Sequence, residues 1–363
     1  MFPASSYQTI YLILVSLLSF AICRNYTNSG RRINSRIREG KLLREVVFVF
    51  LLSLFIGFRP ISSVFVDMVN YADYYDSVST MVFAFDWRAE NIIFDNLLFL
   101  FASLGIKKEL FFVVISVIYF VCMFFACKRL FRNDAFLVYL VCLAAFSTFS
   151  YGVNGIKAGA AASIFLLAIA YHDKIIPSLL IALISYGFHH SMQVLLVAWI
   201  IVLIYHDSRV FLVFWVLCVL LAALQVTFFQ GVFASLTDDT GSAYLSNTDS
   251  STQTFSLSGF RLDFILYSAI PVFLGAYLIL RQKIVSKEYN LLLSLYLLTN
   301  SVWLLCMYAE FTNRIAYLSW FMYPVVLIYP FVTFLKGKRP VIPMKLVIYG
   351  HLLFTIFMAF IYY

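Results

Sequence analysis

The chain has 363 residues, of which 63% are hydrophobic and only 12% are charged, and its mean hydropathy is +0.91. This composition excludes a soluble globular protein, whose surface needs many more charged residues. The formal net charge is +8. The basic residues gather beside apolar runs, which is typical of membrane topology and of contacts with anionic membrane lipid rather than of nucleic-acid binding.

Apolar runs of about 18 or more residues recur along the chain and predict an all-α, polytopic membrane protein. We expect one membrane domain over 1–363, with about twelve transmembrane helices. The N-terminus lacks the positive region and cleavage site of a signal peptide, so the first run is predicted to be retained. The predicted spans are 8–23, 45–66, 109–127, 134–150, 155–171, 176–188, 191–205, 209–228, 262–280, 289–308, 313–335 and 344–362.

One apolar run, 92–105, is short and contains Asp95 and Asn96. If it lies flat or re-enters without crossing, 19 of the 26 lysines and arginines fall on one face, as the positive-inside rule requires. We therefore predict a non-crossing or re-entrant segment and both termini outside. Thirteen crossings is the alternative. This topology gives a basic cytoplasmic loop at 24–44 and two outer, periplasmic loops at 67–91 and 229–260.

Two polar islands interrupt the apolar sequence. The first runs from Tyr151 to Gly159 and the second from Phe188 to Ser191. The 35 residues between Asn154 and His189 suffice for one crossing and a return, so both islands are predicted to meet at the outer face. Ionisable residues at membrane depth are costly and tend to be retained for function.

Asn154 is a good helix N-cap, and helix N-termini attract anions, so Asn154 with Lys157 predicts a diphosphate-binding site. A plain capped helix with a lysine that snorkels to the interface is the alternative. Two adjacent histidines cannot point the same way on a helix, so at most one of His189 and His190 is expected to act. His189 is the candidate general base. No HxxxH or HExxH spacing is present, and we predict no metal and no cofactor.

Other polar residues lie at predicted outer span ends. Arg59, inside the second predicted span, is a candidate phosphate ligand or a snorkelling arginine. Asp67, with Tyr71 and Tyr74, suits a sugar-binding outer loop, although tyrosines are equally common in an interfacial belt. The later candidates are Arg261, Asp263, Glu310, Asn313 and Arg314. As an alternative, Arg261 could merely form an ion pair with Asp263, and Glu310 with Arg314.

These motifs resemble those of EpsG-like, Wzy-type polysaccharide polymerases. Asn154-Gly155-Ile156-Lys157 is similar to the family's Asn-x-(Ile/Leu)-Arg-Gln, and Phe188-His189-His190-Ser191 to its Phe-His-x-Ser. Asp67 with Tyr71 and Tyr74, the Glu90 segment and Arg314 extend the resemblance over most of the chain. Lys157 and Ala158 stand where the family usually has Arg and Gln; lysine keeps the charge but loses bidentate geometry.

The resemblance implies a GT-C-like glycosyltransferase of the bacterial inner membrane, active at the periplasmic face. It would join undecaprenyl-diphosphate-linked oligosaccharide repeat units in O-antigen, lipopolysaccharide or capsule biosynthesis, with a possible chain-length regulator protein as partner. The expected catalytic residues are His189, Asp67 and Glu310. Expected diphosphate ligands are Arg59, Asn154, Lys157, Arg261 and Arg314, and expected sugar contacts are Tyr71, Tyr74, His190, Asp263 and Asn313.

Three other functions remain open at this point. A flippase or transporter of the lipid-linked sugar also needs a cationic cavity, although such proteins usually show repeats or broken helices near mid-membrane. An O-antigen ligase-like transferase or a membrane acyltransferase differs mainly in its product. A purely structural membrane protein is the fourth interpretation, and the cluster of ionisable residues at one face argues against it.

Overall fold

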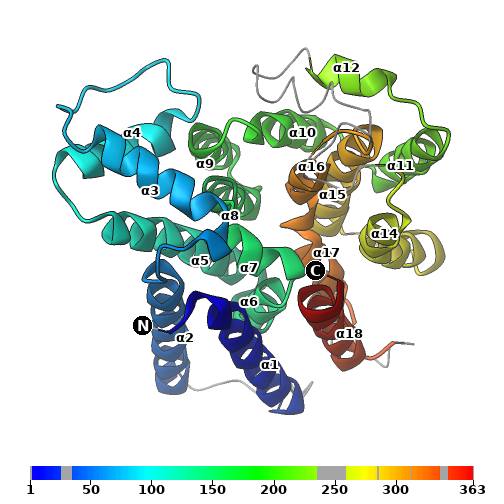
Figure 1. Cartoon of the computed structure of the whole chain (residues 1–363). Coiled ribbons are helices and arrows are strands. Elements are labelled where there is room, and N and C mark those ends of the chain that lie inside the picture. Colours follow the sequence, from blue (N-terminus) through cyan, green and yellow to red (C-terminus); the bar gives the residue numbers. More distant parts are fainter. Residues whose placement is uncertain are drawn as a thin grey trace. The chain divides into compact units, whose positions relative to one another are not determined.

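The computed structural model describes residues 2–25, 35–234, 259–283, 286–310, 312–335 and 342–362. Throughout these ranges every assigned element is a helix (Figure 1), as the composition predicts. The chain divides into two compact units, which we describe separately. Unit 1 comprises Met1–Gln193 and Pro330–Tyr363, and unit 2 comprises Val194–Tyr329.

Five helical segments within the described ranges are long and apolar enough to cross a membrane, which identifies a membrane protein. Several shorter apolar helices of 10–17 residues accompany them. The count of about twelve crossings stays a prediction. The five segments are Ala4–Arg24, Lys108–Leu143, Leu262–Arg281, Thr312–Thr333 and Met344–Ile361.

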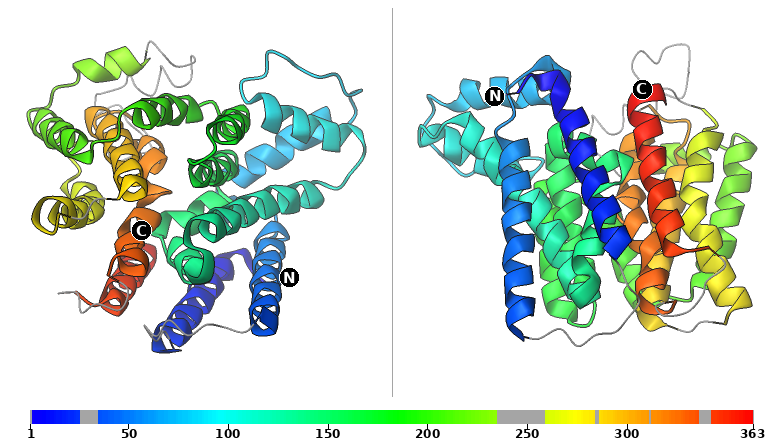
Figure 2. Two further views of the ribbon diagram at one scale, coloured as in Figure 1. Left: turned by 180° about the vertical axis from the view of Figure 1, so that it is seen from behind. Right: turned by 90° about the horizontal axis from the view of Figure 1, so that it is seen from below.

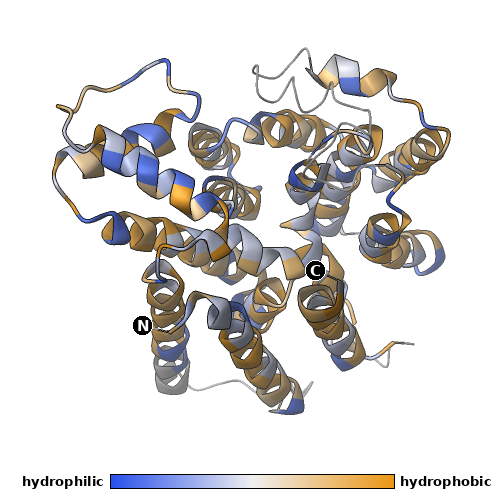
Figure 3. Ribbon diagram, viewed as in Figure 1, coloured by the Kyte–Doolittle hydropathy of each residue, from blue (hydrophilic) through white to orange (hydrophobic). Residues whose placement is uncertain are grey.

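Unit 1 is built around α5, α8 and α9, with α1, α2, α6, α7 and α18 packed about them (Figure 1). Hydrophobic residues dominate these helices, whereas hydrophilic residues are frequent in α3 (Figure 3). The bounds are α1 (Tyr7–Asn25), α2 (Ser35–Gly57), α3 (Asp67–Val78), α4 (Ile92–Ser103), α5 (Lys108–Phe131), α6 (Ala135–Leu143), α7 (Phe146–Val153), α8 (Ile156–Ala170), α9 (Ile175–Phe188) and α18 (Met344–Phe357).

Small residues allow the close packing of α8. Its buried segment Gly159-Ala160-Ala161-Ala162-Ser163 lies at the centre of unit 1. Ser185 of α9 donates a hydrogen bond to the carbonyl of Ala161 (2.6 Å). Small residues and interhelical hydroxyl contacts of this kind are the usual means of helix association in membranes, where lipid is as apolar as the side chains.

The break between α6 and α7 is satisfied by side chains from distant helices. Tyr11 of α1 donates to the carbonyl of Leu143 (2.7 Å), and Thr355 of α18 donates to that of Ala144 (2.5 Å). The ring of His351 lies 3.2 Å from the carbonyl of Val141. Carbonyls at the end of a buried helix need such donors, so α1 and α18 fix the position at which α7 begins.

Helix α2 differs from the predicted second span, 45–66. It begins at Ser35, inside the predicted basic loop 24–44, and ends at Gly57. Proline disfavours helix in the residue before it, so Pro60 explains why Arg59 lies beyond the helix rather than within a span. Residues 26–34 of that predicted loop lie outside the described residues.

The predicted loop 67–91 also contains a helix, α3. Met68, Ala72 and Tyr75 recur at helical spacing and are buried, which gives the segment an apolar face despite its many carboxylates. Helix α4 has 12 residues, which is about 18 Å of helix and shorter than a bilayer core of about 30 Å. In the right-hand view of Figure 2, α3 and α4 lie crosswise to α2, at the end of unit 1 where α1 begins. Whether α4 crosses the bilayer stays a prediction.

Unit 2 is held together by buried polar contacts. Trp215 of α11 donates to the side-chain oxygen of Asn300 (2.7 Å), and the Asn300 amide donates to Ser319 of α16 (2.9 Å). Most of the predicted outer loop 229–260 lies outside the described residues. The bounds are α11 (Ser208–Ala223), α12 (Phe228–Ala234), α14 (Leu262–Ala276), α15 (Lys287–Leu305), α16 (Thr312–Trp320) and α17 (Tyr323–Thr333). Two helices belong to both units: α10 (Met192–Ile204) begins in unit 1, and α17 ends in unit 1.

Candidate functional site

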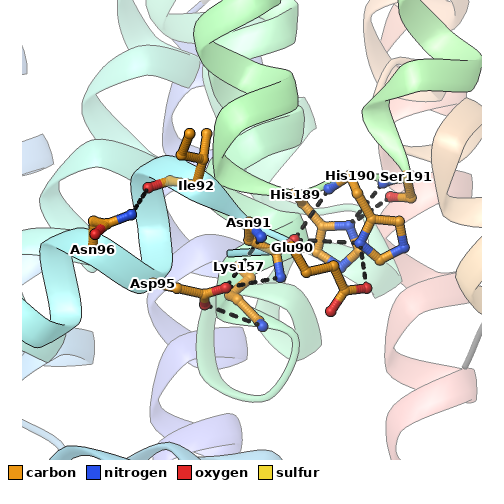
Figure 4. Close-up of polar contacts among 9 residues, drawn as sticks. All are labelled: Glu90, Asn91, Ile92, Asp95, Asn96, Lys157, His189, His190 and Ser191. Carbon is orange, nitrogen blue, oxygen red and sulfur yellow. Dashed lines mark hydrogen bonds and ion pairs between the residues drawn. The ribbon is translucent and has the colours of Figure 1, made fainter. Parts of the chain in front are cut away.

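The two polar islands meet the segment between α3 and α4 in unit 1. Lys157 at the start of α8, and His189 and His190 after α9, face Glu90, Asn91 and Asp95 (Figure 4). These contacts join residues 62 to 100 positions apart in the sequence. Both islands therefore contact a third segment, which the resemblance included through Glu90 but for which no site role was predicted.

The first island forms a tight turn between α7 and α8. Gly155, not Asn154, precedes α8 as its N-cap, and no side chain caps the helix, so the predicted Asn154 cap is wrong. The Asn154 side-chain oxygen is instead buried without a hydrogen-bond partner among the described residues. A Cβ on Gly159 would lie 2.3 Å from the carbonyl oxygen of Tyr151. Glycine there allows α7 and α8 to approach closely enough to form the turn.

Lys157 is held between a carboxylate and two aromatic rings. Its Nζ lies 3.6 Å from Oδ1 of Asp95, 5.8 Å from the ring centre of Tyr71 and 5.5 Å from that of Phe94. The Lys157 and Asp95 side chains are 22% and 21% exposed. An ammonium group over aromatic faces is attracted electrostatically, so the two rings add to the attraction of Asp95 for Lys157 in this partly buried position.

Asn91 connects the lysine pair to the histidines. Its backbone and side-chain nitrogens donate to Oδ2 of Asp95 at 3.1 and 3.4 Å. Its side-chain oxygen accepts from the backbone nitrogen of His190 at 3.1 Å. A carboxylate accepts and an N–H donates, so these partners fix which way the amide points. Asn91 is 1% exposed, so the residue that connects Asp95 to His190 is buried.

The second island forms a corner between α9 and α10. Helix α9 ends at Phe188, His189 is extended (φ −153°, ψ 122°), and α10 begins at Met192. The two imidazole rings are stacked, with centroids 4.8 Å apart. The expectation that adjacent histidines point apart assumed a helix, whereas His189 lies beyond the end of α9 and its ring stacks on that of His190.

The hydrogen bonds of His189 determine its tautomer. Its Nδ1 accepts from the backbone nitrogen of Ser191 at 3.2 Å and lies 2.8 Å from the Ser191 hydroxyl. Because a backbone N–H can only donate, Nδ1 is unprotonated, and the neutral ring carries its proton on Nε2. His189 is thus arranged to donate a hydrogen bond from Nε2 rather than to take up a proton there.

His190 has the opposite arrangement. Its Nδ1 lies 2.9 Å from Oε1 of Glu90 and 3.3 Å from the side-chain oxygen of Asn91. Both partners are acceptors, so Nδ1 carries the proton and the lone pair of the neutral ring is on Nε2. A carboxylate on one imidazole nitrogen that orients the other nitrogen as a base is the arrangement of many catalytic dyads and triads.

A glycine permits the approach of the Glu90 segment to this corner. A Cβ on Gly187 would lie 2.6 Å from Cδ1 of Ile93. Ile93 is in the first turn of α4, directly after Glu90 and Asn91. The small residue near the end of α9 therefore lets α4 lie against the histidine corner.

Arg59 does not face this cluster as a ligand. Its side chain is 1% exposed, and its two terminal nitrogens donate to the carbonyls of Ile56 (3.0 Å) and Val153 (2.7 Å). The guanidinium also lies 5.4 Å from the ring centre of Phe65. The arginine thus ties the end of α2 to the last residue of α7, directly before the turn that carries Lys157.

Helix α3 contributes Tyr71 to the surroundings of the lysine. Asp67, Tyr71 and Tyr74 follow at i, i+4 and i+7 and so share one helix face. Tyr71 packs against Phe94 of α4, with ring centres 5.8 Å apart. Burial, and then the negative charges of Asp95 and Asp86, raise the pKa of Tyr74 above its usual value. Tyr71 thus lies at the side of the cluster that faces α3.

The remaining predicted site residues belong to unit 2. Arg261 donates from Nε and a terminal nitrogen to the two oxygens of Asp263, at 3.0 and 2.7 Å, which is the local pairing left open from the sequence. The guanidinium also covers the ring of Phe264 at 4.1 Å. Glu310 is half-buried, and Asn313 and Arg314 are exposed at the start of α16.

In both units, predicted cationic residues lie beside carboxylates that offset their positive charge. Lys157, His190 and Arg261 each face a carboxylate, respectively Asp95, Glu90 and Asp263. Glu90, Asn91 and Asp95 were not proposed as site residues, although two polar residues within a short apolar run were a usable signal. Among the described residues, no group of three or more metal-ligating side chains is placed to hold a metal ion.

A model of the EpsG family matches residues 44–363, which is most of the chain. The chain belongs to the EpsG family. This is a family of Wzy-type polysaccharide polymerase-like proteins, and membership suggests a polymerase of polysaccharide biosynthesis. No curated protein and no solved structure gives a significant match.

Proposed function

We propose that this EpsG-family protein is a glycosyltransferase that joins undecaprenyl-diphosphate-linked oligosaccharide repeat units at the periplasmic face of the bacterial inner membrane. The observation that carries the proposal is the Glu90–His190 pair beside Lys157. A base next to a cation is what transfer from a diphosphate to a hydroxyl requires, and this pair supports the proposal. Family membership, which suggests a polymerase of polysaccharide biosynthesis, supports the proposed reaction class.

In the proposed reaction, Nε2 of His190 takes the proton of a sugar hydroxyl on the acceptor. The hydroxyl oxygen forms a bond to the anomeric carbon of the donor chain, and the bond from that carbon to the diphosphate oxygen breaks. The diphosphate leaves with the bonding electrons on its lipid. Glu90 stabilises the imidazolium that forms, by the same electrostatic logic as the carboxylate of a catalytic triad.

Lys157 is proposed to stabilise the leaving diphosphate. Its ammonium is mobile on a long stem, and it sits beside the backbone N–H groups that begin α8, where an anion is favoured. His189, with its proton on Nε2, is proposed to donate to a sugar or phosphate oxygen. This assignment exchanges the roles first expected for the two histidines.

The other predicted residues keep or change their proposed roles according to their contacts. Arg59 is proposed to position the Lys157 turn rather than to bind phosphate. Tyr71 and Tyr74 are proposed sugar contacts on α3, and Asp67 remains a proposed catalytic residue that orients the histidine base or substitutes for it. In unit 2, Arg261 and Arg314 remain proposed diphosphate ligands, Glu310 remains a proposed catalytic residue, and Asp263 and Asn313 are proposed sugar contacts.

The test uses purified protein in lipid nanodiscs and a lipid-linked repeat unit as the substrate. Products are resolved by length, with and without a chelator. We expect a ladder of polymers on the lipid carrier, lost in His190→Ala and retained at reduced rate in His189→Ala, which is the matched control one residue away. Transfer to a lipid A core acceptor added to the same assay would indicate a ligase instead, and flipping of an unpolymerised unit in sealed proteoliposomes would indicate a flippase. A full ladder in His190→Ala would refute the base assignment.

A further inference from the structure

Asp95 has two unequal sets of partners. Its Oδ2 accepts two hydrogen bonds from Asn91, at 3.1 and 3.4 Å. Its Oδ1 lies 3.6 Å from the ammonium of Lys157, which is beyond ordinary hydrogen-bond distance. The carboxylate is therefore anchored by a buried amide, and the lysine is attracted to it without being locked.

Lys157 accordingly has a resting position that it can leave. Its other close groups are the rings of Tyr71 and Phe94, which hold a cation by attraction to their faces and not by directed bonds. The site is partly exposed, with 22% of the lysine side chain accessible. A small movement of the ammonium away from Oδ1 breaks no hydrogen bond, while Asp95 stays fixed by Asn91.

We infer that the carboxylate of Asp95 competes with anionic substrate for the ammonium group of Lys157. The inference rests on the proposed function, in which the anion is the diphosphate of the lipid carrier. The carboxylate holds the ammonium when the site is empty, gives it up to the diphosphate of the donor, and attracts it again after transfer. Asp95 is thus a positioning residue that acts through Lys157 and limits how tightly the diphosphate product is retained.

This role has a physical purpose. A bare lysine next to the N-terminus of α8 would bind substrate diphosphate and leaving diphosphate alike, and uniform binding of this kind slows release without speeding the chemical step. A carboxylate that neutralises Lys157 whenever the anion departs weakens the product state. The inference therefore predicts that removing the carboxylate tightens anion binding, whereas loss of a merely structural contact would weaken it.

The experiment measures anion binding directly, on full-length protein in nanodiscs, with inorganic diphosphate and a short-chain polyprenyl diphosphate as probes. Asp95→Asn keeps an oxygen that can accept from Asn91 and removes the charge. We expect both probes to bind about three- to tenfold more tightly to this variant, the range for a partly exposed charge pair. Asp73→Asn, which removes an exposed charge from α3, is the matched control and should stay within about twofold of wild type.

Two further variants keep the result interpretable. Asp95→Ala should shift affinity in the same direction and replaces Asp95→Asn if that variant does not fold. Lys157→Gln combined with Asp95→Asn should lose the gain, because the gain acts through the lysine. Unchanged or weaker binding in folded Asp95→Asn, or a gain that survives without Lys157, overturns the inference.

Turnover separates this inference from the proposed function. In Asp95→Asn we expect a lower KM for the lipid-linked donor and stronger inhibition by undecaprenyl diphosphate. If wild type makes no polymer yet Asp95→Asn binds diphosphate more tightly, the polymerase assignment fails and the competitor role stands. If wild type polymerises and the affinity does not change, the competitor role fails alone.

Discussion

The charged pairs of the candidate site residues differ between the two units. In unit 1, Lys157 meets Asp95 and His190 meets Glu90 across long stretches of sequence, with Asn91 buried between the pairs. In unit 2, Arg261 pairs with Asp263 two residues away. A local pair forms wherever its own segment folds, whereas the unit 1 pairs exist only when α4, α8 and the α9–α10 corner are correctly packed. The energetic cost of assembling unit 1 is one reason to look for function there.

The strongest test of this contrast is the histidine pair. We expect His190→Ala to reduce polymer formation by roughly 10²- to 10⁴-fold, the usual contribution of a general base. His189→Ala should cost about tenfold or less, because a hydrogen-bond donor is lost without the base. Initial rates from the purified protein check both values. Equal losses in the two variants would contradict the tautomer assignment.

The lysine provides the next largest effect. Lys157→Ala should reduce the polymerisation rate by about 10²-fold, because a charge that stabilises the leaving group is removed. Lys157→Arg keeps the charge and should retain a substantial part of the rate. The protein level in the membrane is the control. Normal polymer lengths and rates in Lys157→Ala would remove the lysine from the reaction.

Packing of the first turn can be perturbed without touching a charge. The Cβ introduced by Gly159→Ala would lie 2.3 Å from the backbone oxygen of Tyr151, so α7 and α8 must move apart. We expect a loss of about 1–3 kcal/mol in stability, as for other overpacked sites, together with reduced activity. Thermal unfolding in detergent measures the first effect. Gly231→Ala in unit 2, where a Cβ meets nothing within 4 Å, is the control.

The smallest effect is expected for the local pair. Asp263→Asn removes one partner of Arg261 near the surface, where such pairs contribute about 0–1 kcal/mol. Stability should therefore change little, and polymer formation should fall much less than in Lys157→Ala, because the amide of asparagine can still hydrogen-bond to a sugar. An activity loss as large as that of Lys157→Ala would show that the unit 2 pair belongs to the reaction as directly as the unit 1 pairs do.

The sequence by itself determined the class of the protein. Its repeated apolar runs require helices in a membrane, since backbone groups must be satisfied within each segment there. The two islands indicated Lys157 and the histidines as site residues, because polar residues stand out against apolar spans. The pair of Arg261 and Asp263 was also foreseeable, since both residues lie in one turn.

Only the tertiary structure decided how these residues act. Glu90, Asn91 and Asp95 join the site because α4 packs against α9, where Gly187 admits Ile93. The choice of His190 over His189 depends on which acceptors and donors surround each ring, and those partners come from a segment about 100 residues earlier and from an extended corner. Periodicity specifies helices but not the contacts between distant turns, so the acid–base pairs could not be read from the chain alone.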